Sequence, residues 1–231
     1  MRLAHATASV CLLSTACLAA AQVQPSAPEW VSYRDAYRAM VVFEKYGGAK
    51  NLLQNHLQLV PREKGVLADG MQLALTGKTV RTSLALDALG RTVLPLVKAA
   101  YDENAVLAPN RRLGGFVLRA RVSIATQPDN TYETADLASA CEQALAYARH
   151  VDVGARARRC VGVRMVFAKR SGDISVKLRR PDGEQPLQLV AGAAFAGDVD
   201  ADLPGATYRF SGETAQLVTY SAPLAIVPLF E

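Results

Sequence analysis

The chain has 231 residues, of which half are hydrophobic and a fifth are charged, and its formal net charge is +5. This balance excludes an intrinsically disordered chain, which would have fewer apolar and more charged residues. No nucleic acid partner is expected, because the charge is mild and aromatic residues are not interleaved with the basic ones.

The first 21 residues have the pattern of a cleavable signal peptide. Arg2 supplies a short basic start, residues 6–20 are apolar and small, and Ala19 and Ala21 form an A-x-A pattern before Gln22. Signal peptidase accepts only small side chains at those two positions. A membrane-spanning helix needs about 20 strongly apolar residues, whereas this run is short and interrupted by hydroxyl residues. We therefore expect cleavage after Ala21, a periplasmic or secreted mature chain, and no transmembrane segment after cleavage.

Cys17 offers an alternative processing site. The sequence Leu13-Ser14-Thr15-Ala16-Cys17 partly resembles a bacterial lipobox, in which a small residue precedes the cysteine that receives lipid. Ser14 stands where leucine is usual. The alternative to a freely exported chain is thus a lipoprotein anchored through Cys17.

Two cysteines, Cys141 and Cys160, remain once residues 1–21 are removed from the 231, which leaves 210. That length suffices for one large or two small domains. A cysteine pair in an oxidising compartment indicates a disulfide, worth about 3 kcal/mol on the chain-entropy model. The alternative, a reactive or metal-binding thiol pair, lacks C-x-x-C spacing and a nearby cluster of histidines.

After a polar linker at 22–31, the sequence predicts a helix. Ser32 and Asp35 have the spacing of a capping box, and apolar residues recur at helical spacing through Val41. Gly47-Gly48 then predicts a left-handed helix end.

Strands and turns are predicted next. A second short amphipathic stretch at 52–57 comes first. Alternating apolar and polar residues at 71–76 and 80–86 predict a hairpin, and the turn at 87–90 leads into 91–96. Two consecutive hairpins would form an antiparallel meander.

Residues 105–108 and 116–124 predict further strands. Arg119 and Arg121 share one face of the second strand with Val117 and Ser123, while apolar side chains occupy the other face. This alternation predicts a sheet with one dry and one wet side.

A central helix is predicted from Thr134 to about Arg149. Its apolar stripe contains Cys141, which should point into the core. Cys160 begins a strong strand, 160–167, that would lie against this helix if the disulfide forms. More short strands are predicted at 174–178, 187–190, 208–210, 217–220 and 224–229.

These elements predict an α+β fold, with an antiparallel β-sandwich or two packed β-sheets, an N-terminal helix and one central helix. Pro223 and Pro228 suggest that the last strand lies at a sheet edge. We expect two regions, 32–130 and 131–231, each with a helix and antiparallel strands, either as separate units or as one continuous domain.

Basic residues gather between 141 and 180, where ten stand against three acidic ones, whereas 181–231 contains seven acidic residues and one basic residue. A basic surface could bind anionic envelope components, such as lipid head groups, lipopolysaccharide or glycans, or another envelope protein. The alternative is that these charges protect strand edges and pair with the acidic tail. The residues predicted to form the binding surface are Arg158, Arg159, Lys169, Arg170, Arg179 and Arg180.

Asp198, Asp200 and Asp202 have the spacing of the first half of a calcium loop. Such a loop needs glycine at the sixth position and a bidentate glutamate at the twelfth. Leu203 and Arg209 occupy those positions. We therefore predict a solvated acidic loop and no metal site, and the alternative is an irregular calcium site.

Catalytic motifs are weak or absent in the sequence. It contains no G-x-S-x-G elbow, S-x-x-K pair or glycine-rich phosphate loop. His56 and His150 lie beside an apolar stripe and at a helix end, which favours structural roles. A carboxylate pair would have to combine Asp102-Glu103 with distant residues such as Asp87 or Glu133. We predict no catalytic residue and no cofactor.

Three stretches, Phe43-Glu44-Lys45-Tyr46-Gly47, 84–91 and 100–104, resemble uncharacterised exported proteins of proteobacteria. The resemblance covers about residues 32–230. It implies an exported location and assigns no functional residue.

The leading hypothesis is a non-enzymatic envelope protein with a binding or structural role, and the alternative is a periplasmic hydrolase whose carboxylates converge only in three dimensions. A deep pocket lined by two or more carboxylates would favour the hydrolase. A shallow basic sheet face would favour the binding protein.

Overall fold

The computed structural model describes residues 29–65, 67, 69–169 and 172–231. The predicted signal peptide, Cys17, Arg170 and most of the linker lie outside the described residues. Within them the predicted α+β class is confirmed, with helices and packed antiparallel sheets. No helix among the described residues is long and apolar enough to cross a membrane.

The helices lie on both halves of the chain. They are α1 (Tyr33–Lys45), α2 (Lys98–Asp102), α3 (Thr134–Val151) and a 3-10 turn, η1 (Val153–Ala155). The strands of the N-terminal half are β1 (Val31–Ser32), β2 (Leu53–Pro61), β3 (Gln72–Thr76), β4 (Arg81–Ala85), β5 (Arg91–Thr92), β6 (Val106–Pro109) and β7 (Phe116–Ile124). Those of the C-terminal half are β8 (Thr131–Glu133), β9 (Cys160–Val166), β10 (Val176–Arg180), β11 (Gly183–Pro186), β12 (Leu189–Gly192), β13 (Leu203–Arg209), β14 (Gln216–Thr219) and β15 (Ala225–Phe230).

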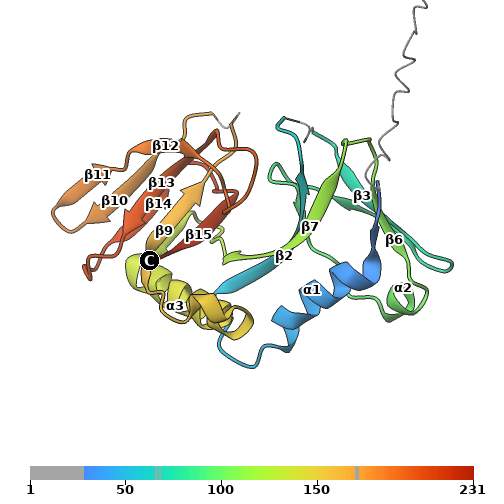
Figure 1. Cartoon of the computed structure of the whole chain (residues 1–231). Helices are drawn as coiled ribbons and strands as arrows, with labels where there is room; N and C mark the ends of the chain where they lie inside the picture. The colour runs from blue at the N-terminus through green and yellow to red at the C-terminus, as the bar shows by residue number, and fades with distance from the viewer. Residues whose placement is uncertain (1–28, 66, 68, 170–171) are drawn as a thin grey trace, which may run out of the picture.

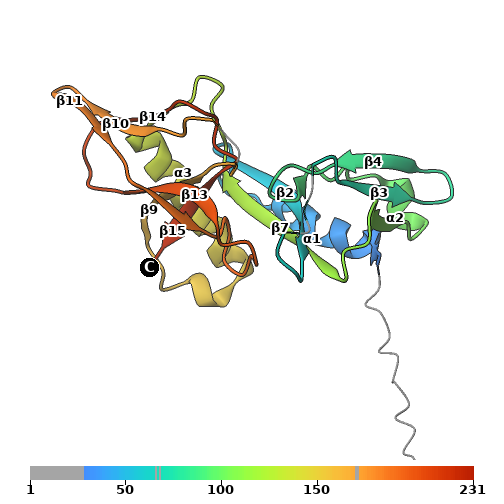
Figure 2. The same ribbon diagram turned by 90° about the horizontal axis from the view of Figure 1, so that it is seen from above.

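In the described part of the chain these strands form three antiparallel sheets, with orders β1-β6-β3-β4, β11-β10-β14-β8 and β12-β13-β9-β15-β7-β2-β5. The seven-stranded sheet contains strands of both halves. β15 and β7 join through one residue pair, Ile226 and Ile124. Figure 1 shows the resulting two-lobed shape, with β2 and β7 running from one lobe to the other. Seen from above, the β3–β4 and β10–β11 hairpins lie at opposite ends of the molecule (Figure 2).

The predicted N-terminal helix is confirmed as α1, with Ser32 as its N-cap residue, but the predicted capping bonds and the left-handed glycine end are wrong. Ser32 makes no side-chain cap bond, and its hydroxyl instead lies 3.1 Å from the side-chain oxygen of Asn104. The helix ends at an extended residue, Tyr46, and neither Gly47 nor Gly48 has a positive φ. The apolar face is nevertheless buried as the spacing predicts, and it packs against β2 and β7.

The second amphipathic stretch is part of β2, a nine-residue strand. Leu53 and Leu57 face the same side in a strand as well as in a helix turn, so the short pattern fits both periods. Gln54, His56 and Gln58 lie on the opposite face, and Asn55 interrupts the row of leucines on the first face. The segment forms a strand because it pairs with β7 along its whole length.

The first predicted hairpin is confirmed by β3 and β4, and the second is wrong. Residues 87–90 do form a turn, closed by a 2.8 Å bond from the Gly90 amide to the Asp87 carbonyl. However, β5 pairs with β2 and not with β4. The meander therefore ends after one hairpin, and the chain crosses to the larger sheet.

The predicted central helix and disulfide are both confirmed. Cys141 on α3 is fully buried and bonds to Cys160 at the start of β9, with Cα atoms 6.0 Å apart. Thr134 does not cap the helix, because its hydroxyl donates to the Glu213 carbonyl at 2.8 Å. The bond fixes α3 on the apolar face of β9.

Strand β15 was predicted at a sheet edge and lies between β9 and β7. Pro228 pairs in register with Val163 on β9. A proline cannot donate to a ladder, but β7 pairs with β15 only at Ile226. Beyond Ile226, the edge of β15 that faces β7 forms no backbone hydrogen bonds with β7. The missing amide of Pro228 therefore breaks no hydrogen bond to β7, although β15 lies between two strands.

Candidate functional site

A cavity of about 500 Å³ lies between the two lobes. Its walls come from the end of β2 and the following loop, the turn at 87–90, the loop after β9, and the segment between β12 and β13. Most of this wall is apolar, as at Leu59, Leu67 and Leu203. The lining residues are Gln58, Leu59, Val60, Pro61, Glu63, Gly65, Leu67, Asp69, Ala88, Leu89, Ala168, Lys169, Asp198, Val199, Asp200 and Leu203.

Four carboxylates and one ammonium group line this cavity. Lys169 donates to both oxygens of Asp200 at 2.8 and 2.9 Å. Burial raises the pKa of Asp200, but hydrogen bonds from Lys169 and the Asp202 amide, with the charge of Lys169, leave it below its ordinary value. Glu63 and Asp69 form no ion pair within the described residues. The lining therefore carries an excess of negative charge.

Asp198 belongs to a buried polar network that joins the lobes. Its carboxylate accepts from Arg121 at 2.7 Å, from Gln58 at 3.1 Å and from the Phe195 amide at 3.3 Å. Arg121 also donates to Gln58 at 2.6 Å, and its guanidinium lies 5.0 Å from the centre of the Phe195 ring. Burial lowers the pKa of Arg121, although the Asp198 charge opposes this shift. The network fixes one wall of the cavity.

The turn at 87–90 forms a second wall. Asp87 accepts from the backbone amides of Leu89 and Arg91 at 2.9 and 2.8 Å and pairs with the Arg91 guanidinium at 2.8 Å. Arg91 is 5% exposed and also donates to the Leu224 carbonyl in the other lobe. Gly90 has a φ of +73°, and a Cβ there would lie 2.6 Å from the Leu59 carbonyl oxygen. This position therefore needs glycine both for conformation and for space.

The predicted basic surface is distributed over separate parts of the C-terminal lobe. Arg158 and Arg159 precede β9, whereas Lys169 follows it, and seven strand residues span roughly 20 Å. Arg179 and Arg180 lie on β10. Arg170 lies outside the described residues. The predicted residues among the described ones therefore do not form one continuous surface, and their binding role stays a prediction.

Acidic residues of the tail pair with several of these cations, as the alternative interpretation expects. Lys169 pairs with Asp200. Arg179 donates to Glu184 at 2.8 Å, and Arg180 donates to Glu213 at 2.7 Å.

The aspartates at 198, 200 and 202 do not converge on a common point, because the first two face Arg121 and Lys169. No group of three or more His, Cys, Asp or Glu that could hold a metal ion occurs among the described residues. The carboxylates considered for a hydrolase are also dispersed. Asp102 pairs with Lys98, Asp87 with Arg91, Glu103 with the Thr79 segment, and Glu133 with Gln216.

Sequence reasoning missed the cavity because its walls are far apart in the chain. Gln58 and Asp198, which are hydrogen-bonded, are 140 residues apart. One signal was present: the predicted wet face of 116–124 contains Arg121, and this side chain holds the network together.

Comparisons of the chain with protein-family models, curated proteins and solved structures found no match. The resemblance to exported proteins of proteobacteria therefore stays a prediction.

Proposed function

We propose that the protein is an exported, non-enzymatic binding protein that holds a small ligand in the cavity between its lobes. The ligand has an apolar body and a positively charged group. The observation that carries this proposal is the combination of apolar walls with four carboxylates and one lysine in a single cavity.

The cavity has the size and lining of a ligand site. Small-molecule pockets usually measure about 300–1,000 Å³ and combine apolar walls with a few polar groups. Glu63 and Asp69 enter the cavity from the loop after β2, and neither is in an ion pair among the described residues. A cationic group of a ligand would supply the missing countercharge.

Export is supported by the signal-peptide pattern at 1–21 and by the disulfide. Stable disulfides are typical of oxidising compartments outside the cytoplasm. A periplasmic or secreted location follows from cleavage after Ala21, and lipidation at Cys17 is the alternative.

Two probes with the same fluorophore and opposite charge test the ligand class. Dansylcadaverine carries an amine, and dansylglycine carries a carboxylate. We expect the amine to give a saturable fluorescence increase with the mature protein, and the carboxylate to give a much weaker one. Equal binding of both probes, or binding of neither, would contradict the proposal.

Variants locate the probe. Ala88 is exposed and lines the cavity, so Ala88→Trp should block binding without burying new volume in a core. Glu63→Gln and Asp69→Asn should each weaken binding severalfold by removing an attractive charge. Asp35→Asn is the matched control, because this exposed carboxylate lies on α1. If Asp35→Asn lost as much affinity as Asp69→Asn, the probe would not bind in the cavity.

A hydrolase is the second candidate, because a pocket lined by two or more carboxylates was the feature expected of one. Two of the four carboxylates are engaged as anions, Asp198 with Arg121 and Asp200 with Lys169. A general acid must hold a proton near neutral pH, and the lowered pKa of Asp200 opposes that role. Turnover of p-nitrophenyl glycosides that is lost in both Glu63→Gln and Asp69→Asn would replace the binding protein with the hydrolase.

Anionic envelope components remain the proposed partners of the exposed arginines before β9, Arg158 and Arg159, and of Arg179 on β10. Retention on anionic liposomes or lipopolysaccharide should fall with added salt. Replacement of Arg158 and Arg159 by glutamine should reduce it further. Salt-independent or absent retention would remove this part of the proposal.

A further inference from the structure

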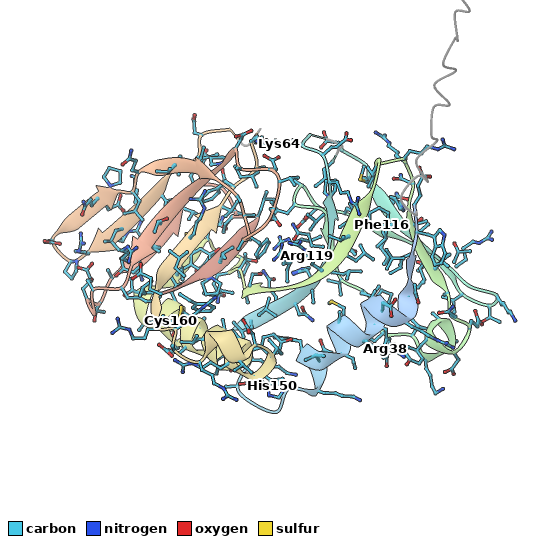
Figure 3. The ribbon with its side chains drawn as sticks, viewed as in Figure 1. Arg38, Lys64, Phe116, Arg119, His150 and Cys160 are labelled. Atoms are coloured by element: carbon cyan, nitrogen blue, oxygen red, sulfur yellow. A yellow bond between two sulfur atoms is a disulfide. The ribbon has the colours of Figure 1, made fainter. Side chains whose placement is uncertain are left out.

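Strand β4 forms one edge of the β1-β6-β3-β4 sheet and lies at the end of the molecule (Figure 2). One face of this sheet covers the core of the N-terminal lobe, in which Figure 3 labels Phe116. Arg81, Thr82, Ser83 and Ala85 of β4 are exposed. An exposed strand edge presents unpaired amides and carbonyls, so it is a template for pairing with another strand.

The other edge strands are protected in ways that β4 is not. Natural proteins protect sheet edges with very short strands, charged side chains or proline. β1, β5 and β8 have only two or three residues, and β11 contains Glu184 and Pro186. β12 is uncharged but has four residues, whereas β4 has five, of which only Arg81 is charged. Among the described residues, β4 is therefore the longest edge strand.

Hydrogen bonds within the β3–β4 hairpin show which groups of β4 have no partner. The Val80 carbonyl accepts from the Gly77 amide at 2.7 Å, and the Leu86 amide donates to the Met71 carbonyl at 3.0 Å. These two residues of the second strand direct their backbone groups toward β3, and so do the even-numbered residues between them, because the direction alternates along a strand. The residues that direct theirs outward, without a hydrogen bond to any described residue, are Arg81, Ser83 and Ala85.

These outward groups fit a second copy of β4 in one register. If two copies run antiparallel with Ser83 opposite Ser83, then Arg81 of each copy lies opposite Ala85 of the other. Each such pair exchanges two backbone hydrogen bonds, so the three pairs form about six. The register that sets Arg81 opposite Arg81 forms fewer pairs and brings like charges together. The register centred on Ser83 is therefore the favoured one.

The core-facing side chains match in the same register. The even-numbered side chains of β4 face the core of the lobe, and Val80, Leu84 and Leu86 are half-buried at its rim. With Ser83 at the centre, Val80 of one copy lies opposite Leu86 of the other, and Leu84 lies opposite Thr82. The second copy thus covers apolar surface that a single copy leaves partly exposed, which favours association.

We propose that β4 pairs with β4 of a second copy across a two-fold axis, so that the two four-stranded sheets join into one. A two-fold contact uses the same surface of both copies, and the register centred on Ser83 meets this condition. Pairing of two five-residue strands gives an interface smaller than the standard size, so we expect a dissociation constant of about 10–100 μM. β4 does not line the cavity between the lobes, so the dimer and the proposed ligand site can fail independently.

Sedimentation equilibrium of the mature protein from micromolar to millimolar concentrations tests the dimer. We expect the average mass to rise from that of a monomer toward that of a dimer. Ser83→Lys and Ser83→Asp should each weaken the dimer about tenfold or more, because two like charges then lie directly opposite each other. Ser83 is exposed, so both variants should fold, which circular dichroism checks. An equimolar mixture of the two variants should dimerise again, because lysine then faces aspartate.

Ala191→Lys is the matched control. Ala191 is exposed on β12, an uncharged edge strand, so this variant adds the same charge at a different edge and should leave the dimer unchanged. Monomers at every concentration would overturn the proposal, and so would a dimer that Ser83→Lys leaves intact. Loss of the dimer in Ala191→Lys alone would place the contact at β12. A mixture of the two Ser83 variants that stays monomeric would exclude the two-fold pairing.

Discussion

Replacing Asp198 with asparagine should strongly destabilise the protein, because it breaks the buried pair with Arg121. The two side chains are 9% and 15% exposed. Removing one partner of a buried pair leaves the other charge uncompensated and costs about 3–5 kcal/mol. With a urea m-value of about 3 kcal/mol/M, the unfolding midpoint should fall by about 1–2 M.

The same substitution at Asp200 is the matched control. Asp200 is two residues away and pairs with Lys169, but these side chains are 35% and 45% exposed. Such an exposed pair contributes about 0–1 kcal/mol. Urea unfolding of Asp198→Asn and Asp200→Asn, followed by circular dichroism, should therefore give clearly different midpoints. Equal midpoints would refute the claim that the network joins the lobes. Adding Arg121→Met to Asp198→Asn should recover part of the loss, since no unpaired charge then remains.

Three further changes test the fold and the site. Replacing Cys141 and Cys160 with alanine should lower the free energy of unfolding by about 3 kcal/mol, because a loop with a sequence separation of 19 is no longer closed; two free thiols in the mass of native exported protein would contradict the bond. The pKa of His56 is below its ordinary value of 6.5, because of burial and a neighbouring arginine. His56 in the unfolded chain therefore binds a proton more readily than His56 in the folded chain. The free energy of unfolding should then fall as the pH drops below about 6.5. In His56→Gln, the melting temperature should depend less on pH between pH 5 and 7. Gly90→Ala should lower the free energy of unfolding by about 1 kcal/mol or more beyond Gly212→Ala, because both glycines have positive φ but only Gly90 faces a backbone oxygen; equal losses would exclude the steric part.

Helices and the disulfide could be predicted because their signals are local. The spacing of Ala36, Met40 and Phe43 defines a helix face whatever lies against it, and two cysteines in a mature chain permit one pairing. Strand partners could not be predicted in this way. The turn at 87–90 is defined by its own residues, but nothing in it selects β2 over β4 as the neighbour of β5. Turn chemistry fixes a change of direction and leaves the partner open.

The site could not be predicted because its polar groups are stabilised by residues distant in sequence. Asp198 in isolation fits half of a calcium loop, and Arg121 fits the wet side of a strand. Both patterns predict a solvent-exposed side chain, as would be expected if each segment stood alone. When the lobes pack together, these two side chains become partners, and the part of the wet side around Arg121 becomes a buried contact, whereas Val117 and Arg119 stay exposed. The sequence contains one hint of this ion pair, which is that the two residues have opposite charges.

The junction between the lobes explains why polar groups gather there. Backbone pairing between β7 and β15 consists of Ile124 and Ile226, so the two parts of the large sheet separate on either side of this pair. Where strands separate, the ladder no longer satisfies donors and acceptors, and side chains must do so. The bonds from the Gln58 side chain to the Leu89 carbonyl and from Arg91 to the Leu224 carbonyl take over this role. The same separation leaves space beside these side chains, which is why the cavity lined by both lobes occurs at the junction.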